Sequence, residues 1–467
     1  MTNLSSISGA LRPVPVTLAI LTAIAAGWLI GTNPVVGVVL VIGGLAGLSI
    51  VANPMLGIYA IISSLVVGQF VRLPAFGGAG AVLPNDILIP AIAIGWLLAG
   101  LLRQRVEFVT SPLSWPLASM LVVFVLTFIL GVYQLPFLTD RQIVASALYI
   151  VRWLEYVMLF FVVADLVRSE KRGRRVMWWL ISAAAALAIL GFFQLKLFPD
   201  FRFMVPQGWD PHIGRLLSTW FDPNFLGGFF ALVTAAVLGL AIFARGRERI
   251  ALWVCAAVLF AALVLTFSRS SYAALLVVGV ILTLLRSRRM FLLLVVVLGI
   301  VVLTVPRVQE RVLGALSIDE TARLRLVSWQ NALTVVRDHP VTGIGYNTYR
   351  FVQVDYGFLK DSTEHSAGGS DSSLLTILVT TGPLGVLTYL WIVWSSLSIA
   401  WSSYRSKTAS AFTKGLGLGA LAGLVGLLVH SVFINSLLFP HMMEVLAVMF
   451  GILVGLGTKP ARQLNVV

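Results

Sequence analysis

Apolar runs of about 20 residues recur from Pro13 to Gly457, and this repetition restricts the folds that the chain can adopt. Each run is long enough for an α-helix to cross a bilayer, and no polar stretch of domain size interrupts the series. The runs predict an all-α fold, a polytopic transmembrane helical bundle of about 12–14 helices. The first run is expected to be a retained helix rather than a cleaved signal peptide. The ranges expected to be helical are 13–31, 34–52, 54–71, 84–102, 112–133, 142–167, 176–197, 223–244, 250–267, 271–285, 290–305, 373–401, 415–435 and 440–457.

The composition excludes a soluble globular enzyme. Of the 467 residues, 59% are hydrophobic and 11% are charged, whereas soluble domains are about 25% charged. The single cysteine, Cys255, lies in an apolar run, so the chain can form no internal disulfide and no thiolate metal site. HExxH, CxxC and Walker patterns do not occur, and neither a metal nor a cofactor is expected.

The basic residues predict how the chain is oriented. There are 33 Lys and Arg against 19 Asp and Glu, a net charge of +14. In a membrane protein such an excess indicates cytoplasmic loops rather than a nucleic-acid partner. The basic clusters fall in alternate loops, at 168–175, 245–249, 286–289 and 405–414. We therefore expect these loops and both termini to be cytoplasmic, and two long segments, 198–222 and 306–372, to be external.

The longer external segment, 306–372, is expected to be partly helical. From Thr321 to Val336 its apolar residues recur at helical spacing, which predicts an amphipathic helix lying on the membrane as a lid. Gly343 and Gly345 lack the third glycine and the Lys-Ser/Thr of a nucleotide loop, so they predict a turn instead.

Several arginines on the external side are candidate anion ligands. Arg269 lies in a short turn between two apolar runs with no acid close in sequence, which indicates a cavity or a phosphate contact. The alternative is an interface arginine whose charge reaches the headgroups. Arg215 precedes the next apolar run, and Arg323 and Arg325 precede Trp329 in the long segment.

Two acidic residues lie where helices are expected to begin. Asp222, followed by Pro and Asn224, is typical of a helix cap and first turn, whose free amide groups attract anions. Asp371 or Ser370 is expected to cap the helix that starts near 373. His365 lies in the Gly-rich stretch before it, where a solvated surface histidine is the simpler interpretation.

Ionisable residues inside the apolar runs must pair or line a cavity, because an isolated charge there is costly. Arg152 and Glu155 are three residues apart on one helical face and are expected to form an ion pair. Residues that could line a cavity are Asp222, Asn224, Arg152, Glu155 and His430.

Four stretches together resemble the signatures of the bacterial O-antigen ligase/polymerase family. The resemblance covers about residues 210–457, while the first half matches only in hydropathy. Its domains would be 1–209, N-terminal transmembrane helices; 210–457, the ligase/polymerase-like region including loop 306–372; and 458–467, a cytoplasmic tail. The stretches are Arg215 to Gly227, Leu265 to Ser271, Arg325 to Trp329 followed by Asp338 to Gly345, and Ser372 to Gly385.

The resemblance implies a metal-independent glycosyltransferase of the membrane-embedded GT-C type in the bacterial inner membrane, with its active site on the periplasmic side. Such an enzyme takes a glycan from undecaprenyl diphosphate and transfers it to a sugar hydroxyl, on another lipid-linked glycan in polymerases or on lipid A core in ligases. The family's diphosphate-binding arginines map onto Arg215, Arg269 and Arg325, with Arg323 as an adjacent substitute. Planar, permanently charged and bidentate, guanidinium groups suit a diphosphate.

The chain departs from the ligases at one position. They carry a histidine followed by a small polar residue where this chain has Asp371-Ser372, eleven residues before Gly382. Asp371 is therefore the candidate catalytic base, with His365 as a second candidate. The substitution favours a polymerase over a lipid A core ligase. A transporter or flippase for polyprenyl-linked glycans is the alternative of another class, although the unexplained arginines lie on one side only.

Overall fold

The computed structural model describes residues 44, 47–75, 80–102, 108–207, 209–286, 288–314, 319–361 and 365–457. In this part of the chain ten helices are long and apolar enough to cross a membrane, and two more, α11 (Arg269–Leu285) and α12 (Arg288–Thr304), are shorter. The ten are α4 (Pro54–Val67, continued by the 3-10 turn η1, Gly68–Val71), α5 (Asn85–Leu102), α6 (Ser114–Gln134), α7 (Asp140–Leu166), α8 (Glu170–Leu197), α9 (Pro223–Phe243), α10 (Gly246–Leu265), α16 (Ser373–Arg405), α17 (Ala411–His430) and α18 (Pro440–Gly457).

The all-α, polytopic fold is thus confirmed. From residue 54 onward a helix occupies each expected range, whereas 13–31 and most of 34–52 lie outside the described residues. One element departs from this pattern: Leu73–Ala75 (β1) and Gly80–Val82 (β2) form a small antiparallel hairpin. The chain divides into two compact units, 1–57 with 91–106, and 58–90 with 107–467. All the features discussed below belong to the second unit.

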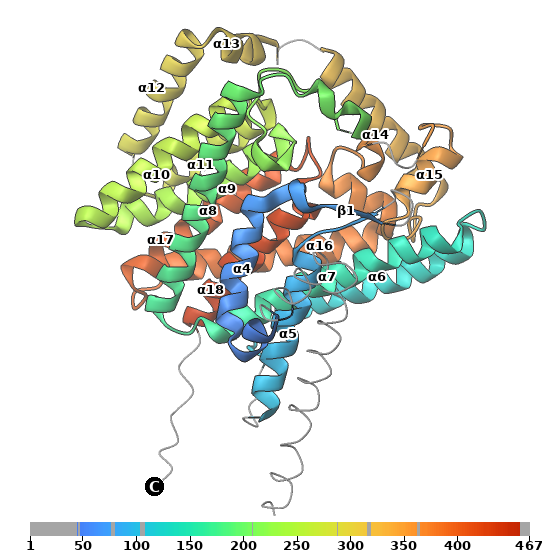
Figure 1. Ribbon diagram of the computed structural model, residues 1–467, viewed down its shortest axis with the longest axis horizontal. Helices are drawn as coiled ribbons and strands as arrows, with labels where there is room; N and C mark the ends of the chain where they lie inside the picture. The colour runs from blue at the N-terminus through green and yellow to red at the C-terminus, as the bar shows by residue number, and fades with distance from the viewer. Residues whose placement is uncertain are drawn as a thin grey trace, which may run out of the picture. The chain divides into compact units, whose positions relative to one another are not determined.

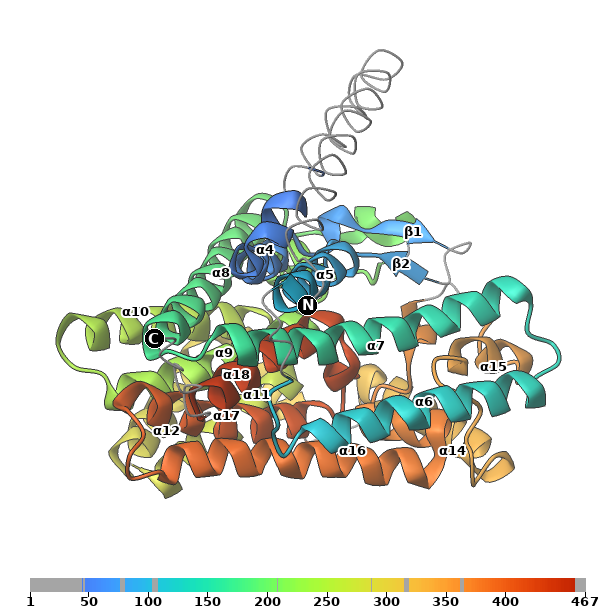
Figure 2. The ribbon, with the colours of Figure 1, turned by 90° about the horizontal axis from the view of Figure 1, so that it is seen from below.

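Segment 306–372 is partly helical, as expected. It contains α13 (Pro306–Leu313), α14 (Glu320–Asp338), α15 (Tyr349–Asp355) and the 3-10 turn η6 (His365–Gly368). Figure 1 shows α12 to α15 (yellow to orange) following one another along one edge of the bundle, and Figure 2 shows α7, α6 and α16 side by side.

Helix α14 packs on the bundle with one side and keeps its predicted apolar stripe largely exposed on another. Ala332 and Val335 are fully buried against α15 and α16, whereas Leu324, Val327 and Leu333 are 55%, 40% and 43% exposed. An apolar stripe at helical spacing does not distinguish a face that meets protein from one that meets lipid. The exposed stripe fits a helix lying on a membrane.

Glycines allow α9 and α17 to pack very closely. Gly415, Gly419 and Gly423 are spaced four residues apart on one side of α17, and all three face α9. A Cβ on Gly419 would lie 2.6 Å from the Cα of Ala236, closer than real Cβ contacts. Small residues at this spacing are typical of membrane helices whose backbones touch. The contact places the end of α17 beside the start of α9.

Helix α16 is kinked, and a loop fills the kink. Gly382 has φ 64° and Pro383 follows it, so the hydrogen-bonding pattern of the helix is broken there. The N–H groups of Ile344 and Gly345 donate to the carbonyls of Val379 and Thr380, at 3.1 and 2.9 Å. The glycine pair at 343 and 345 thus forms a turn, as expected, and this turn is attached to α16.

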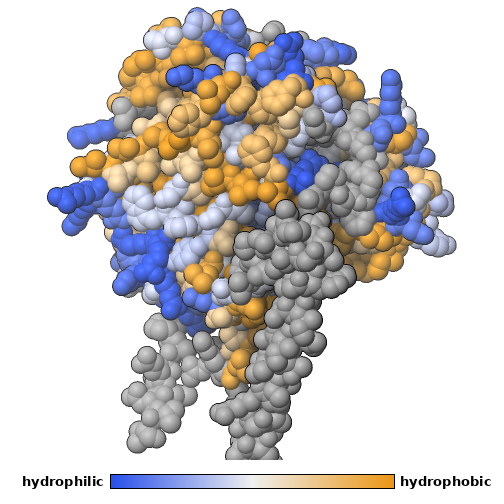
Figure 3. All heavy atoms as spheres, viewed as in Figure 1, coloured by the Kyte–Doolittle hydropathy of each residue, from blue (hydrophilic) through white to orange (hydrophobic). Residues whose placement is uncertain are grey.

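Much of the surface is apolar. On the face drawn in Figure 3, apolar side chains (orange) form broad patches between hydrophilic ones (blue). Large side chains such as Trp115, Leu387 and Trp394 are 74%, 64% and 71% exposed. Apolar surface of this extent fits a lipid environment better than water.

Candidate functional site

The N-terminal ends of three helices meet around the end of α17. The Nε2 atom of His430, the last residue of α17, lies 3.3 Å from Ser271 Oγ in the first turn of α11. A Cβ on Gly228, near the start of α9, would lie 2.8 Å from the same ring. The N–H of Ser373, the first residue of α16, donates to the carbonyl of Ser431 at 2.9 Å. Helix N-termini carry unsatisfied N–H groups and partial positive charge, so this meeting point favours anions.

Each of these three helices is preceded by strained backbone. Phe221, Phe267 and Asp371 have φ angles of 58°, 49° and 54°. For residues other than glycine such a conformation costs on the order of 1–3 kcal/mol. Strain of this kind is characteristic of functional sites, and here it occurs just before the starts of α9, α11 and α16.

Asp222 caps α9, as predicted. Its Oδ1 accepts from the N–H groups of Asn224 and Phe225 at 2.7 and 3.1 Å, and the residue is only 7% exposed. Asn224 in turn accepts from Arg215 at 3.2 Å, and Arg215 Nε donates to the carbonyl of Thr266 at 2.8 Å. Arg215 therefore connects the start of α9 with the turn before α11.

Arg269 has an acidic partner that is distant in sequence. Its NH2 group donates to both carboxylate oxygens of Asp319, at 2.9 and 2.8 Å, and NH1 donates to the carbonyl of Gly314 at 3.1 Å. Asp319 is the N-cap of α14. Partial burial alone would raise the pKa of Asp319, but the hydrogen bonds from Arg269 and from the N–H of Ala322 lower it overall. Arg269 thus joins the start of α11 to the start of α14.

Of the two neighbouring arginines on α14, Arg325 faces the cluster. It is half-buried, and the charges nearest to it include Asp371, Arg269 and Asp222. Burial lowers the pKa of Arg325, and Asp371 opposes that effect. Arg323 lies two residues earlier, about 200° around the helix. Its side chain is 61% exposed and binds Glu320.

Two further arginines, Arg307 and Arg311 on α13, were missed by the sequence analysis. Arg307 donates to the carbonyls of Ile213 and Gly214, and its guanidinium lies 4.5 Å from the ring centre of Phe267. Burial lowers the pKa of Arg215, and the positive charges of Arg307 and Arg311 lower it further. The negative charge of Asp222 acts in the opposite direction. Their four-residue spacing on a short helix was the signal available in the sequence.

Asp371 is exposed and is not the cap of α16. Ser372, in extended conformation, takes that position, and its Oγ accepts from the N–H of Leu375 at 3.5 Å. The expectation that Asp371 or Ser370 caps the helix is therefore wrong, because a cap needs extended backbone and Asp371 has a positive φ. The carboxylate instead lies near Arg325 and Tyr349. For His365 the structure describes the backbone, at the start of η6, and not the side chain.

The expected ion pair between Arg152 and Glu155 is not formed. Arg152 binds Asp86 instead, through Nε to Oδ1 at 2.7 Å and NH2 to Oδ2 at 2.6 Å. The Asp86 carboxylate accepts from two N–H groups of the Arg152 guanidinium at once. It is therefore a better partner than Glu155, which lies three residues away on the same helix. Glu155 Oε2 is buried and has no hydrogen-bond partner within the described part of the chain.

His430 is fully buried, so its ring packs against the residues of the site and is not itself accessible. Besides Ser271, its ring lies 3.1 Å from Ser436 Oγ through Nδ1, and the backbone of Asn224 is within hydrogen-bond reach. The ring therefore holds the ends of α9, α11 and α17 together.

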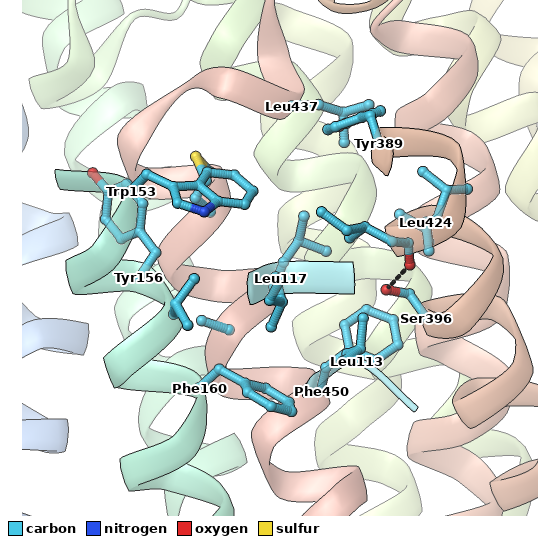
Figure 4. A pocket seen from close by; sticks show the side chains of 16 residues that line it. Leu113, Leu117, Trp153, Tyr156, Phe160, Tyr389, Ser396, Leu424, Leu437 and Phe450 are labelled. Carbon is cyan, nitrogen blue, oxygen red and sulfur yellow. Dashed lines mark hydrogen bonds between the residues drawn. The ribbon is translucent and has the colours of Figure 1, made fainter. Parts of the chain in front are cut away.

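A separate pocket is apolar. Figure 4 shows it lined by Trp153, Tyr156 and Phe160 of α7, Tyr389 of α16 and Phe450 of α18, among others. No described residue that lines it carries a charge. It suits an apolar group and is distinct from the arginine cluster. Among the residues that the structure describes, no group of three or more His, Cys, Asp or Glu side chains is placed to hold a metal ion.

A comparison with protein families matches residues 254–390 to the family described as O-antigen ligase. The matched region contains Arg269, Arg325 and Asp371 and confirms the resemblance for three of the four stretches, whereas the stretch from Arg215 to Gly227 lies outside it. A comparison with curated proteins found no match.

Proposed function

We propose that this chain, a multi-pass membrane protein with an O-antigen ligase region at residues 254–390, transfers a glycan from undecaprenyl diphosphate to a sugar hydroxyl on the external face of the bacterial inner membrane. The observation that carries the proposal is the meeting of three helix N-termini with three arginines. The charge of Asp222 acts on Arg215 and on Arg325, and the charge of Arg269 acts on Arg325. Guanidinium groups bind diphosphates, and the partial positive charge of helix N-termini favours anions.

The chemistry assigned to these residues is a displacement at the anomeric carbon. The acceptor hydroxyl oxygen forms a bond to that carbon, the bond from the carbon to the diphosphate oxygen breaks, and the hydroxyl proton passes to the Asp371 carboxylate. Negative charge grows on the departing diphosphate, and the arginines stabilise it. In many enzymes that act on phosphate esters a divalent metal ion supplies this positive charge, so the arginines support a metal-independent, GT-C type reaction.

The acceptor distinguishes a polymerase from a ligase. We favour a polymerase, whose acceptor is another lipid-linked glycan, because Asp371 stands where the ligases of the family carry histidine. Transfer to lipid A core is the alternative. In both cases the active site would be periplasmic and both termini cytoplasmic.

The test is a transfer assay with the purified protein and a fluorescent undecaprenyl-diphosphate-linked glycan in lipid vesicles. We expect free undecaprenyl diphosphate together with a longer or transferred glycan, and the activity should survive EDTA. Arg202→Ala is a matched control, because Arg202 is exposed and binds Asp200. Movement of the glycan across the vesicle membrane without cleavage would instead indicate a carrier, and strict dependence on Mg²⁺ or Mn²⁺ would refute the metal-independent mechanism.

A further inference from the structure

A second group of arginines lies outside the cluster described above. It consists of Arg72, which follows η1, Arg152 on α7 and Arg350 on α15. Arg152 NH2 donates to the carbonyl of Ala81 at 2.7 Å, and Ala81 pairs with Pro74 in the strand that begins directly after Arg72. The charges of Arg152 and Arg350 both act on Arg72. The residues whose charges act on Arg325 are different, namely Asp371, Arg269, Asp319 and Asp222. The two groups therefore have no arginine in common.

The surroundings of this second group suit a phosphate. Asp86 orients Arg152 through a bidentate pair. The guanidinium of Arg72 instead lies 5.4 Å from the ring centre of Trp209, and that of Arg152 lies 4.8 Å from the ring of Tyr149. Aromatic faces orient guanidinium groups without neutralising them. The positive charges of Arg350 and Arg152 disfavour the charged form of Arg72, and a bound anion offsets this effect.

The second group is connected to Asp371 through α15 and η6. Arg350 NH2 lies 4.0 Å from the position that a Cβ on Gly368 would take, and Gly368 is three residues before Asp371. Tyr349, the neighbour of Arg350, is close enough to Asp371 for the carboxylate to act on its ionisation. Asp371 is thus near Arg325 of the first group and near the segment that carries Arg350 of the second.

From this placement we infer that Arg72, with Arg350 and Arg152, forms a second anion site, which holds the phosphate of the acceptor lipid while the first arginine cluster holds the donor diphosphate. The inference rests on the proposed function. Two phosphate-bearing lipids must approach the same base from different directions, and Asp371 lies near Arg325 of the first group and near the segment that carries Arg350 of the second. The shared chemistry is a lipid phosphate: a second undecaprenyl diphosphate in a polymerase, or the phosphates of lipid A in a ligase.

Binding of the lipids can be measured without turnover. A negative binding result is therefore distinguishable from a lack of transfer activity, which would refute the proposed function. The probes are undecaprenyl diphosphate without glycan, and lipid A, each counted per chain by native mass spectrometry in detergent. A polymerase should bind two undecaprenyl diphosphates, and a ligase one undecaprenyl diphosphate and one lipid A. The Arg72→Ala/Arg350→Ala variant should lose one equivalent, of undecaprenyl diphosphate in the first case and of lipid A in the second.

The remaining donor equivalent in that variant shows that the protein is folded. Arg269→Ala/Arg325→Ala should lose one equivalent of undecaprenyl diphosphate in either case and, in a ligase, keep the lipid A, and Arg202→Ala should keep both equivalents. In turnover, Arg72→Gln, at an exposed position, should raise the acceptor KM by about tenfold and leave the donor KM unchanged. The inference is overturned if Arg72→Ala/Arg350→Ala binds both probes as the wild type does, or if phosphatidylglycerol displaces the second equivalent at the same concentration.

Discussion

Arg269 is oriented by Asp319 through two hydrogen bonds, so its guanidinium needs little reorganisation to meet a diphosphate. We expect Arg269→Ala to lower the transfer rate about 10²- to 10³-fold, which corresponds to about 2–4 kcal/mol of transition-state stabilisation. Arg269→Lys should rescue only partly, because an ammonium group lacks the bidentate fork. The measurement is kcat/KM in the vesicle assay.

The control for this prediction is Asp319→Ala, which removes the partner of Arg269 and keeps the arginine. If Arg269 served only to anchor α14, the two variants would lose activity equally. A much smaller loss in Asp319→Ala supports direct contact between Arg269 and the diphosphate, and near wild-type turnover in a folded Arg269→Ala protein would refute the mechanism.

Asp371 is the candidate base with an observed position. Its carboxylate is exposed, lies near Arg325 and is held on strained backbone at the start of α16. Asp371→Asn should therefore reduce the transfer rate about 10²-fold or more while undecaprenyl diphosphate binding is retained, as removal of a general base does. His365→Ala serves as the comparison. If His365→Ala abolishes transfer and Asp371→Asn has little effect, the histidine is the base.

At the residue scale, the contacts predicted correctly from the sequence are those between residues close together in the chain. The cap at Asp222 was correct because Asp, Pro and Asn224 act within one turn. The partner of Arg269 lies 50 residues away, on a segment whose position depends on the whole bundle. The same limit explains the wrong partner for Arg152. Arg307 and Arg311 were overlooked because their four-residue spacing on a short polar helix does not indicate which cluster the helix joins.

Among the elements, the packing of α9 against α17 gives a sharp prediction. Gly419→Ala should push the two backbones apart, because its Cβ would lie 2.6 Å from the Cα of Ala236. We expect a loss of about 1–3 kcal/mol of stability, as overpacking causes, together with reduced activity as His430 shifts. Thermal unfolding in detergent is the measurement.

Gly299→Ala on α12 is the matched control, because a Cβ there would meet nothing within 4 Å. It should unfold at the wild-type temperature or slightly above it, since alanine favours helix. Equal stability of the two variants would show that α9 and α17 are not in close contact.

Helix ranges were predicted well because about 20 apolar residues in a row identify a membrane helix almost irrespective of context. The hairpin of β1 and β2 was missed, since its three-residue strands are too short to produce an alternating pattern. The side of α14 that packs on the bundle, with Ala332 and Val335, was not predicted. Hydrophobicity alone marks both the side that contacts protein and the side that contacts lipid.

For the whole molecule, the orientation of the chain is the remaining prediction from charge. In a Cys255→Ser background, Asp355→Cys should react with an impermeant thiol reagent from outside intact cells, and Arg172→Cys only after permeabilisation. Both positions are exposed in the structure, so access depends on the membrane alone. External labelling of position 172 together with protection of position 355 would reverse the orientation and place the arginine clusters in the cytoplasm.

The loop that fills the kink of α16 also has a consequence for biogenesis. Carbonyls freed inside a membrane helix are costly until donors reach them. Here the donors, on Ile344 and Gly345, precede Val379 and Thr380 in the chain, so the ribosome produces them first. When α16 is synthesised, the segment that completes its hydrogen bonds has already emerged, and the kinked helix can leave the translocon without waiting for any later part of the protein.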